Sequence, residues 1–126
     1  MTDSTKRVFL LILFSVILAS AGQLLTKSGM TAVGKIELLQ LLSPTSSRVV
    51  LNPLIILGLS LYPIASLIWL VVLSRAELSY AYPLVGMGYI ITSIIAWVLF
   101  KENMTLFRFL GITLIVAGVY LISLKK

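Results

Sequence analysis

The chain has 126 residues, of which 60% are hydrophobic and 11% are charged, and its mean hydropathy is +1.12. This composition is typical of an integral membrane protein and excludes an ordinary soluble domain. Without cysteine or histidine, and with only four acidic residues, the sequence lacks thiol chemistry and the usual ligands of a metal site. Its net charge of +6 arises from basic residues at the ends of apolar stretches, where they meet lipid headgroups, so we expect no metal, no cofactor and no nucleic-acid partner.

Four apolar stretches are each close to the roughly 20 residues that a helix needs to cross the hydrocarbon core. We expect spans at about 8–27, 54–73, 78–100 and 106–124. The chain is then one all-α, four-span membrane domain, 1–126, and its first apolar run is too long for a cleaved signal core. In the longest connection, residues 35–42 predict a short helix in the headgroup plane or, alternatively, an ordered loop.

Two sets of side chains share one broad face of the first span. Small residues recur at i, i+4, i+7 and i+11: Ser15, Ala19, Gly22 and Thr26. Polar residues recur beside them at i, i+3 and i+7: Ser20, Gln23 and Lys27. Small side chains let another helix backbone approach, and polar side chains in hydrocarbon turn toward protein or water. The first span is therefore predicted to form a wall of an internal cavity.

The second and third spans add aromatic and deformable positions. In the second span, one helix face carries Tyr62, Ser66 and Trp69. Pro63 is expected to kink this helix, because it lacks a backbone N–H and its ring clashes with the preceding turn. In the third span, one stripe carries Tyr82, Gly86, Tyr89 and Ser93. Pro83, Gly86 and Gly88 make this the most deformable of the four helices, and we predict a hinge there.

The fourth span predicts an oligomer. Gly111 and Gly118 lie seven residues apart on one helix face, a spacing that favours close contact with another helix at a dimer interface. The basic residues do not decide the orientation, because five fall on each side: Lys6, Arg7, Arg75, Lys125 and Lys126 against Lys27, Lys35, Arg48, Lys101 and Arg108. Either the chain inserts both ways and forms an antiparallel homodimer, or a heterologous partner, such as a similar small subunit, fixes its orientation.

Four motifs, in the right spans and order, resemble a known superfamily. They are AGQLLTKSG, AYPLVGMGY, LFKENMT and GITLIVAGVYLI. Over nearly the whole chain they resemble the small four-helix members of the drug/metabolite transporter superfamily. A-G-Q-L-x-x-K and A-Y-P-L favour the branch of EamA-like flippase subunits for aminoarabinose-phosphoundecaprenol over the small multidrug resistance antiporters. The resemblance implies a small multidrug resistance-like bundle that packs as a dimer through Gly111 and Gly118, in a bacterial-type inner membrane.

One departure from the multidrug branch is chemical. Those antiporters carry an intramembrane glutamate in the first span that binds either a proton or a cationic drug. When Gly22 and Lys27 are aligned with their counterparts, Ala19 stands at that position. An alanine cannot take up a proton as a buried carboxylate of raised pKa can. The resemblance therefore does not extend to proton-coupled export of cations.

The leading interpretation is a transporter or flippase subunit that moves a lipid-linked anionic sugar carrier, or a related amphiphile, between leaflets by alternating access. Its lipid tail would stay in the bilayer while Gln23 and Lys27 meet the polar head. The candidate substrate-binding residues are Ser20, Gln23, Lys27, Tyr62, Trp69, Tyr82, Tyr89, Ser93 and Glu102. The alternatives are a small multidrug resistance-like exporter of cations or small metabolites, and a non-transporting membrane assembly subunit. An enzyme is not expected, because no nucleophile, base and acid fall within reach of one another.

Several of these candidates also have a purely structural interpretation. Lys27, at the end of a span, can extend to the interface, and Gln23 can bond to a neighbouring helix. Tyr82 can belong to the aromatic belt at the membrane surface, and Trp69 can serve packing alone. Glu102, beside Lys101, can form a surface ion pair, which contributes little to stability. The arrangement of the helices decides between these interpretations.

Overall fold

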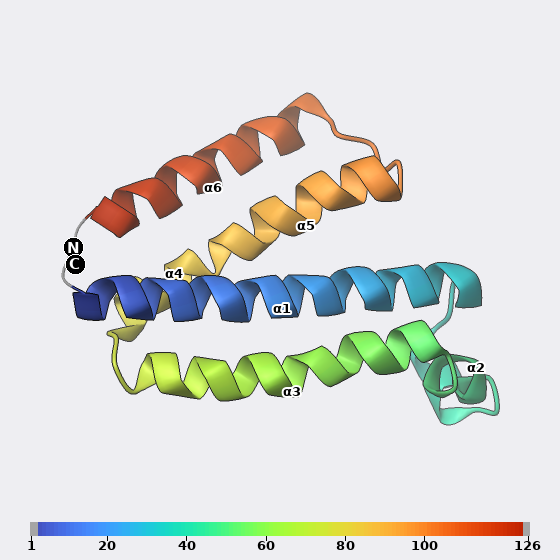
Figure 1. The fold of residues 1–126 in the computed structure, drawn as a ribbon. Coiled ribbons are helices and arrows are strands. Elements are labelled where there is room, and N and C mark those ends of the chain that lie inside the picture. Colours follow the sequence, from blue (N-terminus) through green and yellow to red (C-terminus); the bar gives the residue numbers. More distant parts are fainter. Residues whose placement is uncertain (1–2, 125–126) are drawn as a thin grey trace.

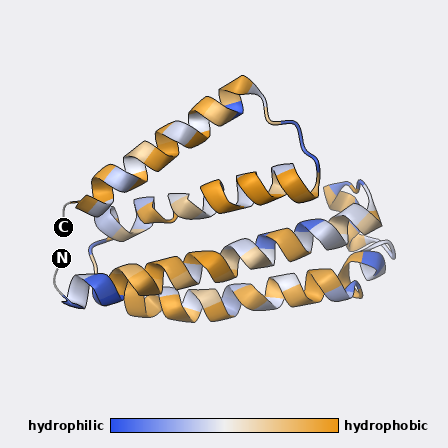
Figure 2. Cartoon of the chain, turned by 45° about the horizontal axis from the view of Figure 1, so that its top comes forward, coloured by the Kyte–Doolittle hydropathy of each residue, from blue (hydrophilic) through white to orange (hydrophobic). Residues whose placement is uncertain are grey.

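The structure, a computed structural model, describes residues 3–124, so Lys125 and Lys126 of the charge comparison lie outside it. The regular elements in this range are all helical: α1 (Asp3–Val33), η1 (Leu38–Leu42), α2 (Ser46–Val50), α3 (Pro53–Leu73), α4 (Leu78–Leu84), α5 (Gly86–Leu99) and α6 (Leu106–Leu124) (Figure 1). Four segments are long and apolar enough to cross a membrane: α1, α3, α4 with α5, and α6. This confirms the predicted all-α, four-helix class. Figure 2 shows the apolar colour over most of these helices and hydrophilic residues mainly at their ends and connections.

The helices are arranged with α1 in the middle. It packs against α3 on one side and α5 on another, while α6 packs against α4 and α5 on the side away from α3 (Figure 1). The start of α1, the connection from α3 to α4 and the end of α6 lie at one end of the bundle. The long connection containing η1 and α2 and the connection from α5 to α6 lie at the other.

Two glycines bring the backbones of α1 and α3 into contact. A Cβ atom added at Gly58 would lie 2.7 Å from the Gly22 carbonyl oxygen and 2.5 Å from Thr26 Oγ1. Farther along, Ser15 Oγ donates a hydrogen bond of 3.0 Å to the Ala65 carbonyl. The small face of the first span therefore meets another helix backbone, as predicted.

Asn52 joins the ends of the same two helices. Its Oδ1 accepts hydrogen bonds from the backbone N–H groups of Leu54 (3.0 Å) and Ile55 (3.3 Å), as an N-cap of α3 should. Its Nδ2 donates to the Gly29 carbonyl of α1 at 3.3 Å. One side chain thus satisfies free groups at the start of α3 and holds them against the last turns of α1.

The third predicted span consists of two helices, α4 and α5, separated at Val85. Pro83 lies in the last turn of α4, where its missing N–H removes one hydrogen bond of the helical ladder. Gly88 N donates to the Val85 carbonyl at 2.8 Å and restarts the helix. Pro63, in contrast, lies within α3, which continues from Pro53 to Leu73. The predicted hinge therefore coincides with a break in the helix, while its motion remains a prediction.

A cluster of buried apolar side chains lies where α1, α3 and α4 meet: Val8, Ile12, Val16, Val72, Tyr80, Ala81 and Leu84. The connection 35–42 is different, because the leucines of η1 are exposed: Leu38 is 80% exposed and Leu42 is 87% exposed. Exposed leucines in a short helical turn suit the surface of a bilayer. The interfacial position of this segment remains a prediction.

Candidate functional site

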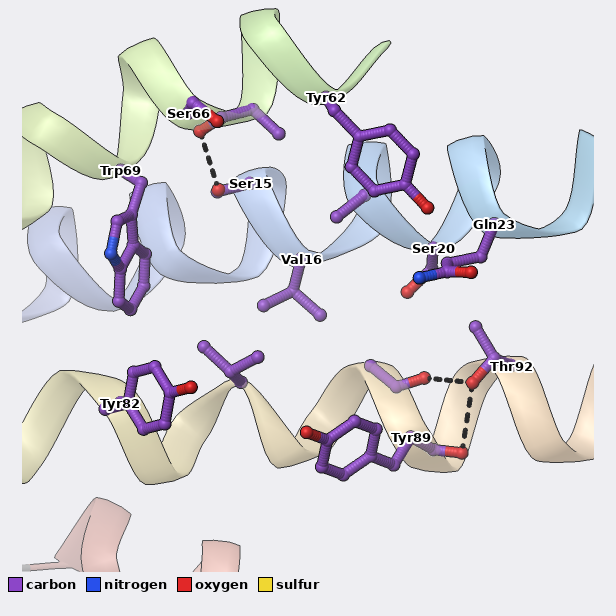
Figure 3. A pocket seen from close by; sticks show the side chains of 14 residues that line it. Ser15, Val16, Ser20, Gln23, Tyr62, Ser66, Trp69, Tyr82, Tyr89 and Thr92 are labelled. Carbon is purple, nitrogen blue, oxygen red and sulfur yellow. Dashed lines mark hydrogen bonds between the residues drawn. The ribbon is translucent and has the colours of Figure 1, made fainter. Parts of the chain in front are cut away.

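A cavity of about 380 Å³ is lined by α1, α3 and the α4–α5 segment (Figure 3). We call it the central groove. Its lining residues are Ser15, Val16, Ala19, Ser20 and Gln23 from α1, Tyr62, Ala65, Ser66 and Trp69 from α3, and Tyr82, Val85, Gly88, Tyr89 and Thr92 from the α4–α5 segment. All fourteen side chains are uncharged. The groove is therefore polar in places but carries no formal charge on these residues.

Gly88 lets α5 approach α1 at the bottom of the groove. A Cβ atom at this position would lie 3.2 Å from Val16 Cγ1 and 3.3 Å from Ser20 Oγ, which is closer than most side chains allow. Ser20 is consequently buried, with 4% of its surface exposed. A glycine near the helix break thus gives the groove a narrow floor, and this packing role is separate from any role in a hinge.

Some polar groups of the groove are already used within the protein. The Thr92 hydroxyl donates 2.7 Å to the Gly88 carbonyl of its own helix, and Ser15 is bonded to Ala65. The Gln23 amide and the hydroxyls of Tyr82 and Tyr89 have no hydrogen-bond partner within residues 3–124. These groups remain able to bind a ligand.

Aromatic rings stand on both walls of the groove. Figure 3 shows Tyr62 and Trp69 on α3 facing Tyr82 and Tyr89 on the opposite wall. Tyr82 is 65% exposed and Tyr89 is 61% exposed, so their rings are not part of the packed core. Aromatic rings offer flat apolar surfaces with a polar edge, and their faces attract cations. Such walls are able to cover the face of a sugar or another ring and to attract a cation.

Six of the nine predicted binding residues line the central groove: Ser20, Gln23, Tyr62, Trp69, Tyr82 and Tyr89. The other three, Lys27, Ser93 and Glu102, do not line it. Lys27 Nζ lies 3.8 Å from Glu102 Oε1, an ion pair between α1 and the connection from α5 to α6. The structure thus gathers most of the candidates in one place, and their role in binding remains a prediction.

A second cavity of about 420 Å³, which we call the outer cavity, lies beside α5 and α6. It is lined by Ser93, Trp97, Glu102, Asn103, Met104, Arg108, Gly111, Ile112 and Ile115. Arg108 donates one guanidinium hydrogen bond of 2.7 Å to the Asn103 carbonyl, so part of its donor capacity supports the loop. Unlike the central groove, this cavity contains charged side chains.

The sequence is similar to known membrane proteins over nearly its whole length. It is 31% identical to the probable 4-amino-4-deoxy-L-arabinose-phosphoundecaprenol flippase subunit ArnF of Proteus mirabilis, with 95% of this chain and 94% of the relative aligned. It is 38% identical to the ArnF of Erwinia tasmaniensis over 86% and 87% of the two chains. It is 32% identical to the ArnE of Pectobacterium atrosepticum over 91% and 96%. The chain belongs to this family of flippase subunits. No family model and no solved structure matches it.

Membership in the flippase-subunit family confirms the branch that the first-span and third-span motifs favoured. ArnE and ArnF relatives match at similar identity, so identity alone does not assign the chain to one subunit type. Ala19, which the resemblance aligns with the glutamate of the multidrug antiporters, lines the central groove. A carboxylate is therefore absent from this position of the groove.

Gly111 and Gly118 of α6 have open space at the position of a Cβ atom. Within residues 3–124, no heavy atom beyond their own helix neighbourhood lies within 4 Å of a Cβ added at either glycine. These glycines are therefore not needed for close helix contact inside the chain. Their place at a dimer interface remains a prediction.

Sequence reasoning missed some groove residues, and one predicted binding residue lines a different cavity. Val16, Ala65, Val85 and Thr92 line the groove but were not singled out, although Thr92 follows Tyr89 at i+3 and could have been found by that spacing. Ser93 was placed on the stripe with Tyr82 and Tyr89, yet it lines the outer cavity. The reason is that α5 lies between two cavities, so one predicted stripe is divided between them.

Proposed function

We propose that the chain is one subunit of a flippase that moves 4-amino-4-deoxy-L-arabinose-phosphoundecaprenol between the leaflets of a bacterial inner membrane. The observation that carries this proposal is the uncharged central groove, with its aromatic walls and free polar groups, in a chain whose relatives have this lipid in their names. The groove is a path for the headgroup, and the polyprenyl tail stays in the bilayer.

The chemistry of the headgroup fits the groove. A protonated amino group and a phosphodiester give it one positive and one negative charge, so its net charge is close to zero. An isolated charge is costly inside a membrane, whereas two opposite charges on one headgroup partly compensate each other and its hydroxyl groups need hydrogen bonds. The amide of Gln23 and the hydroxyls of Tyr82 and Tyr89 supply these, and the rings can cover sugar faces and attract the ammonium group.

The size of the groove supports a division between head and tail. A volume of about 380 Å³ lies at the lower end of the range typical of small-molecule sites, roughly 300–1,000 Å³. This is enough for a sugar phosphate but far too small for a long polyprenyl chain. The tail therefore has to remain among lipid acyl chains while the head passes along α1.

The partner in this proposal is a second small subunit of the same family, giving a heterodimer. Relatives named ArnE and ArnF both match the chain, and a Cβ atom added at Gly111 or Gly118 of α6 would have no atom of the described chain within 4 Å beyond its own helix neighbourhood. Motion at the α4–α5 break would move one wall of the groove against the α1–α3 pair and so expose it alternately. A homodimer is the alternative outcome of an assembly experiment.

A vesicle assay tests the proposed function. The full chain is reconstituted alone and with a co-purified subunit of the other type, together with aminoarabinose-phosphoundecaprenol. Periodate, which does not cross the membrane, oxidises the sugar in the outer leaflet only, so lipid from the inner leaflet reacts only after it has flipped. We expect complete and rapid oxidation with the protein and a protected inner pool without it. A protected pool in the presence of both subunits would refute the function.

Groove variants connect that activity to the geometry. Ser20→Ala and Gln23→Ala each remove polar groups that line the groove, and a lost neutral hydrogen bond corresponds to roughly a three- to tenfold slower rate. Ser60→Ala is the matched control, because Ser60 is exposed on α3 and donates 2.6 Å to Leu57 of its own helix. Equal rates for all three variants and the unmodified protein would exclude the groove as the path.

A further inference from the structure

We infer that Lys27 and Glu102 recognise the two charges of the headgroup by giving up their mutual ion pair and each binding the opposite charge on the headgroup. This inference rests on the proposed function. In the exchange, the Lys27 ammonium leaves Glu102 and binds the phosphate, while the Glu102 carboxylate binds the amino group of the sugar. One protein ion pair and one zwitterion thus become two complementary pairs.

Lys27 extends the polar side of the central groove. It follows Gln23 by four residues on α1, so the two side chains share a face and lie about 6 Å apart along the helix axis. Gln23 lines the groove and Lys27 stands one turn beyond it, toward the C-terminal end of α1. A headgroup that leaves the uncharged groove at this end therefore meets Lys27 next.

Glu102 is held opposite Lys27 by the end of α5. Phe100 caps that helix, and Lys101 adopts a left-handed backbone conformation with φ of 52°. A left-handed residue just past a helix end reverses the chain direction, and glycine is the usual choice there. The reversal places the Glu102 carboxylate near α1 and on the border of the outer cavity.

The pair is loose enough to be exchanged. The Nζ to Oε1 distance of 3.8 Å exceeds that of a charge-assisted hydrogen bond, and the side chains are 56% and 44% exposed. Exposed pairs of this kind contribute little to stability. A phosphate oxygen in direct contact with the Lys27 ammonium would form a shorter and stronger bond.

The exchange explains how a phosphate lipid with an amine is distinguished from one without it. The phosphate of a lipid without the amine could bind the Lys27 ammonium, but the Glu102 carboxylate would then have no cation as partner. The lipid with the amine gains a second ion pair that the other lipid lacks, and specificity is such a difference between two affinities. The residues that determine selectivity would therefore lie at the end of the groove, and the groove itself stays uncharged.

Two single variants and two lipids test the inference in the periodate assay. The lipids are aminoarabinose-phosphoundecaprenol and its N-acetylated form, which keeps the oxidisable sugar diol and the phosphate but has no positive charge. Lys27→Met should slow both lipids at least about tenfold, as expected for a lost charge-assisted bond. Glu102→Gln should slow only the amino lipid and so reduce the preference for it. Equal preference for the two lipids in the unmodified protein would overturn the inference.

A charge swap separates recognition from a structural role. The double variant Lys27→Glu with Glu102→Lys keeps an ion pair but reverses its ends, so it should remain slow for the amino lipid. If the swap restores the original rate, the pair only holds α1 against the loop and the inference is wrong. Arg75→Met and Glu77→Gln, exposed at the opposite end of the bundle, are the matched charge controls and should not change either rate.

Separate control measurements distinguish a folding defect from a loss of flippase function. Thermal unfolding of each purified variant should match that of the unmodified protein, because both side chains of the pair are largely exposed. If the unmodified protein flips neither lipid, the proposed function fails. If it flips the amino lipid and the single variants do so equally well, the proposed function stands and only the charge exchange is excluded.

Discussion

The α1–α3 pair and the α6 helix are both apolar helical segments of one chain, but they are packed in opposite ways. Between α1 and α3, backbone meets backbone at Gly22 and Gly58, and a Cβ atom at either glycine would lie 2.7 Å from a carbonyl oxygen. On α6, Gly111 and Gly118 have space around them within the described chain. Glycine at a helix surface therefore has two different consequences here, and the sequence spacing alone does not distinguish them.

This difference separates a tightly packed part of the molecule from a more loosely packed one. The α1–α3 pair is tied by close contact, by the Ser15 bond to Ala65 and by the Asn52 cap. The opposite wall contains the α4–α5 break and is flanked by α6, which has no buried residue in the described chain. The central groove lies between the two parts. The proposed alternating access would use this combination, with the tightly packed pair as the side that keeps its shape.

The largest effect is expected from filling the α1–α3 contact. Gly58→Ala places a methyl group 2.5 Å from Thr26 Oγ1 and 2.8 Å from Thr26 N, and backbone atoms cannot move aside cheaply. We expect a loss of about 1–3 kcal/mol in the free energy of unfolding, measured in detergent by denaturant titration. Gly111→Ala is the matched control, because the same gain in helix propensity, about 1 kcal/mol, applies without a clash. Equal stability of the two variants would remove the distinction between the two regions.

A smaller effect is expected from the Asn52 side chain. Asn52→Ala removes the cap of α3 and the donor to Gly29, and loss of an N-cap costs about 1 kcal/mol. Asn52→Asp keeps the acceptor oxygen of the cap but loses the Nδ2 donor. Its stability should therefore fall between those of the unmodified protein and Asn52→Ala. If Asn52→Asp is as unstable as Asn52→Ala, the bond between the helices, rather than the cap, carries the effect.

The fold could be predicted further than the site. Apolar length gave the four spans, and the spacing of Ser15, Gly22 and Thr26 gave the face that meets another helix, because both depend on short-range periodicity. The partner of that face could not be predicted, since any of three other spans could supply it. The same limit applies to Lys27 and Glu102, which are distant in sequence and meet only through the tertiary arrangement.

The groove shows the same limit at single residues. Gln23 and Tyr89 were found because polar and aromatic residues on apolar helices are conspicuous. Ser93 lines the outer cavity instead of the groove, because a helix face predicts neighbours only on its own helix, and α5 has a cavity on each of two sides. Gly88 was predicted as part of a hinge, and the structure adds a packing role against Val16 that depends on the approach of α1.

The smallest effect on the stability of the chain is expected at Gly118. Unlike Gly22 and Gly58, this glycine has no close neighbour within the described chain. Gly118→Leu fills open space, so the free energy of unfolding of the isolated chain should change only by the gain in helix propensity, less than about 1 kcal/mol. If this face binds a second subunit through close helix contact, the same leucine should weaken co-purification of that subunit, because the backbones could no longer approach. Val116→Phe, an enlargement on a distant side of α6, is the control and should leave assembly intact. Assembly that tolerates Gly118→Leu but not Val116→Phe would place the interface on the other side of α6, and the free glycines would then face lipid alone.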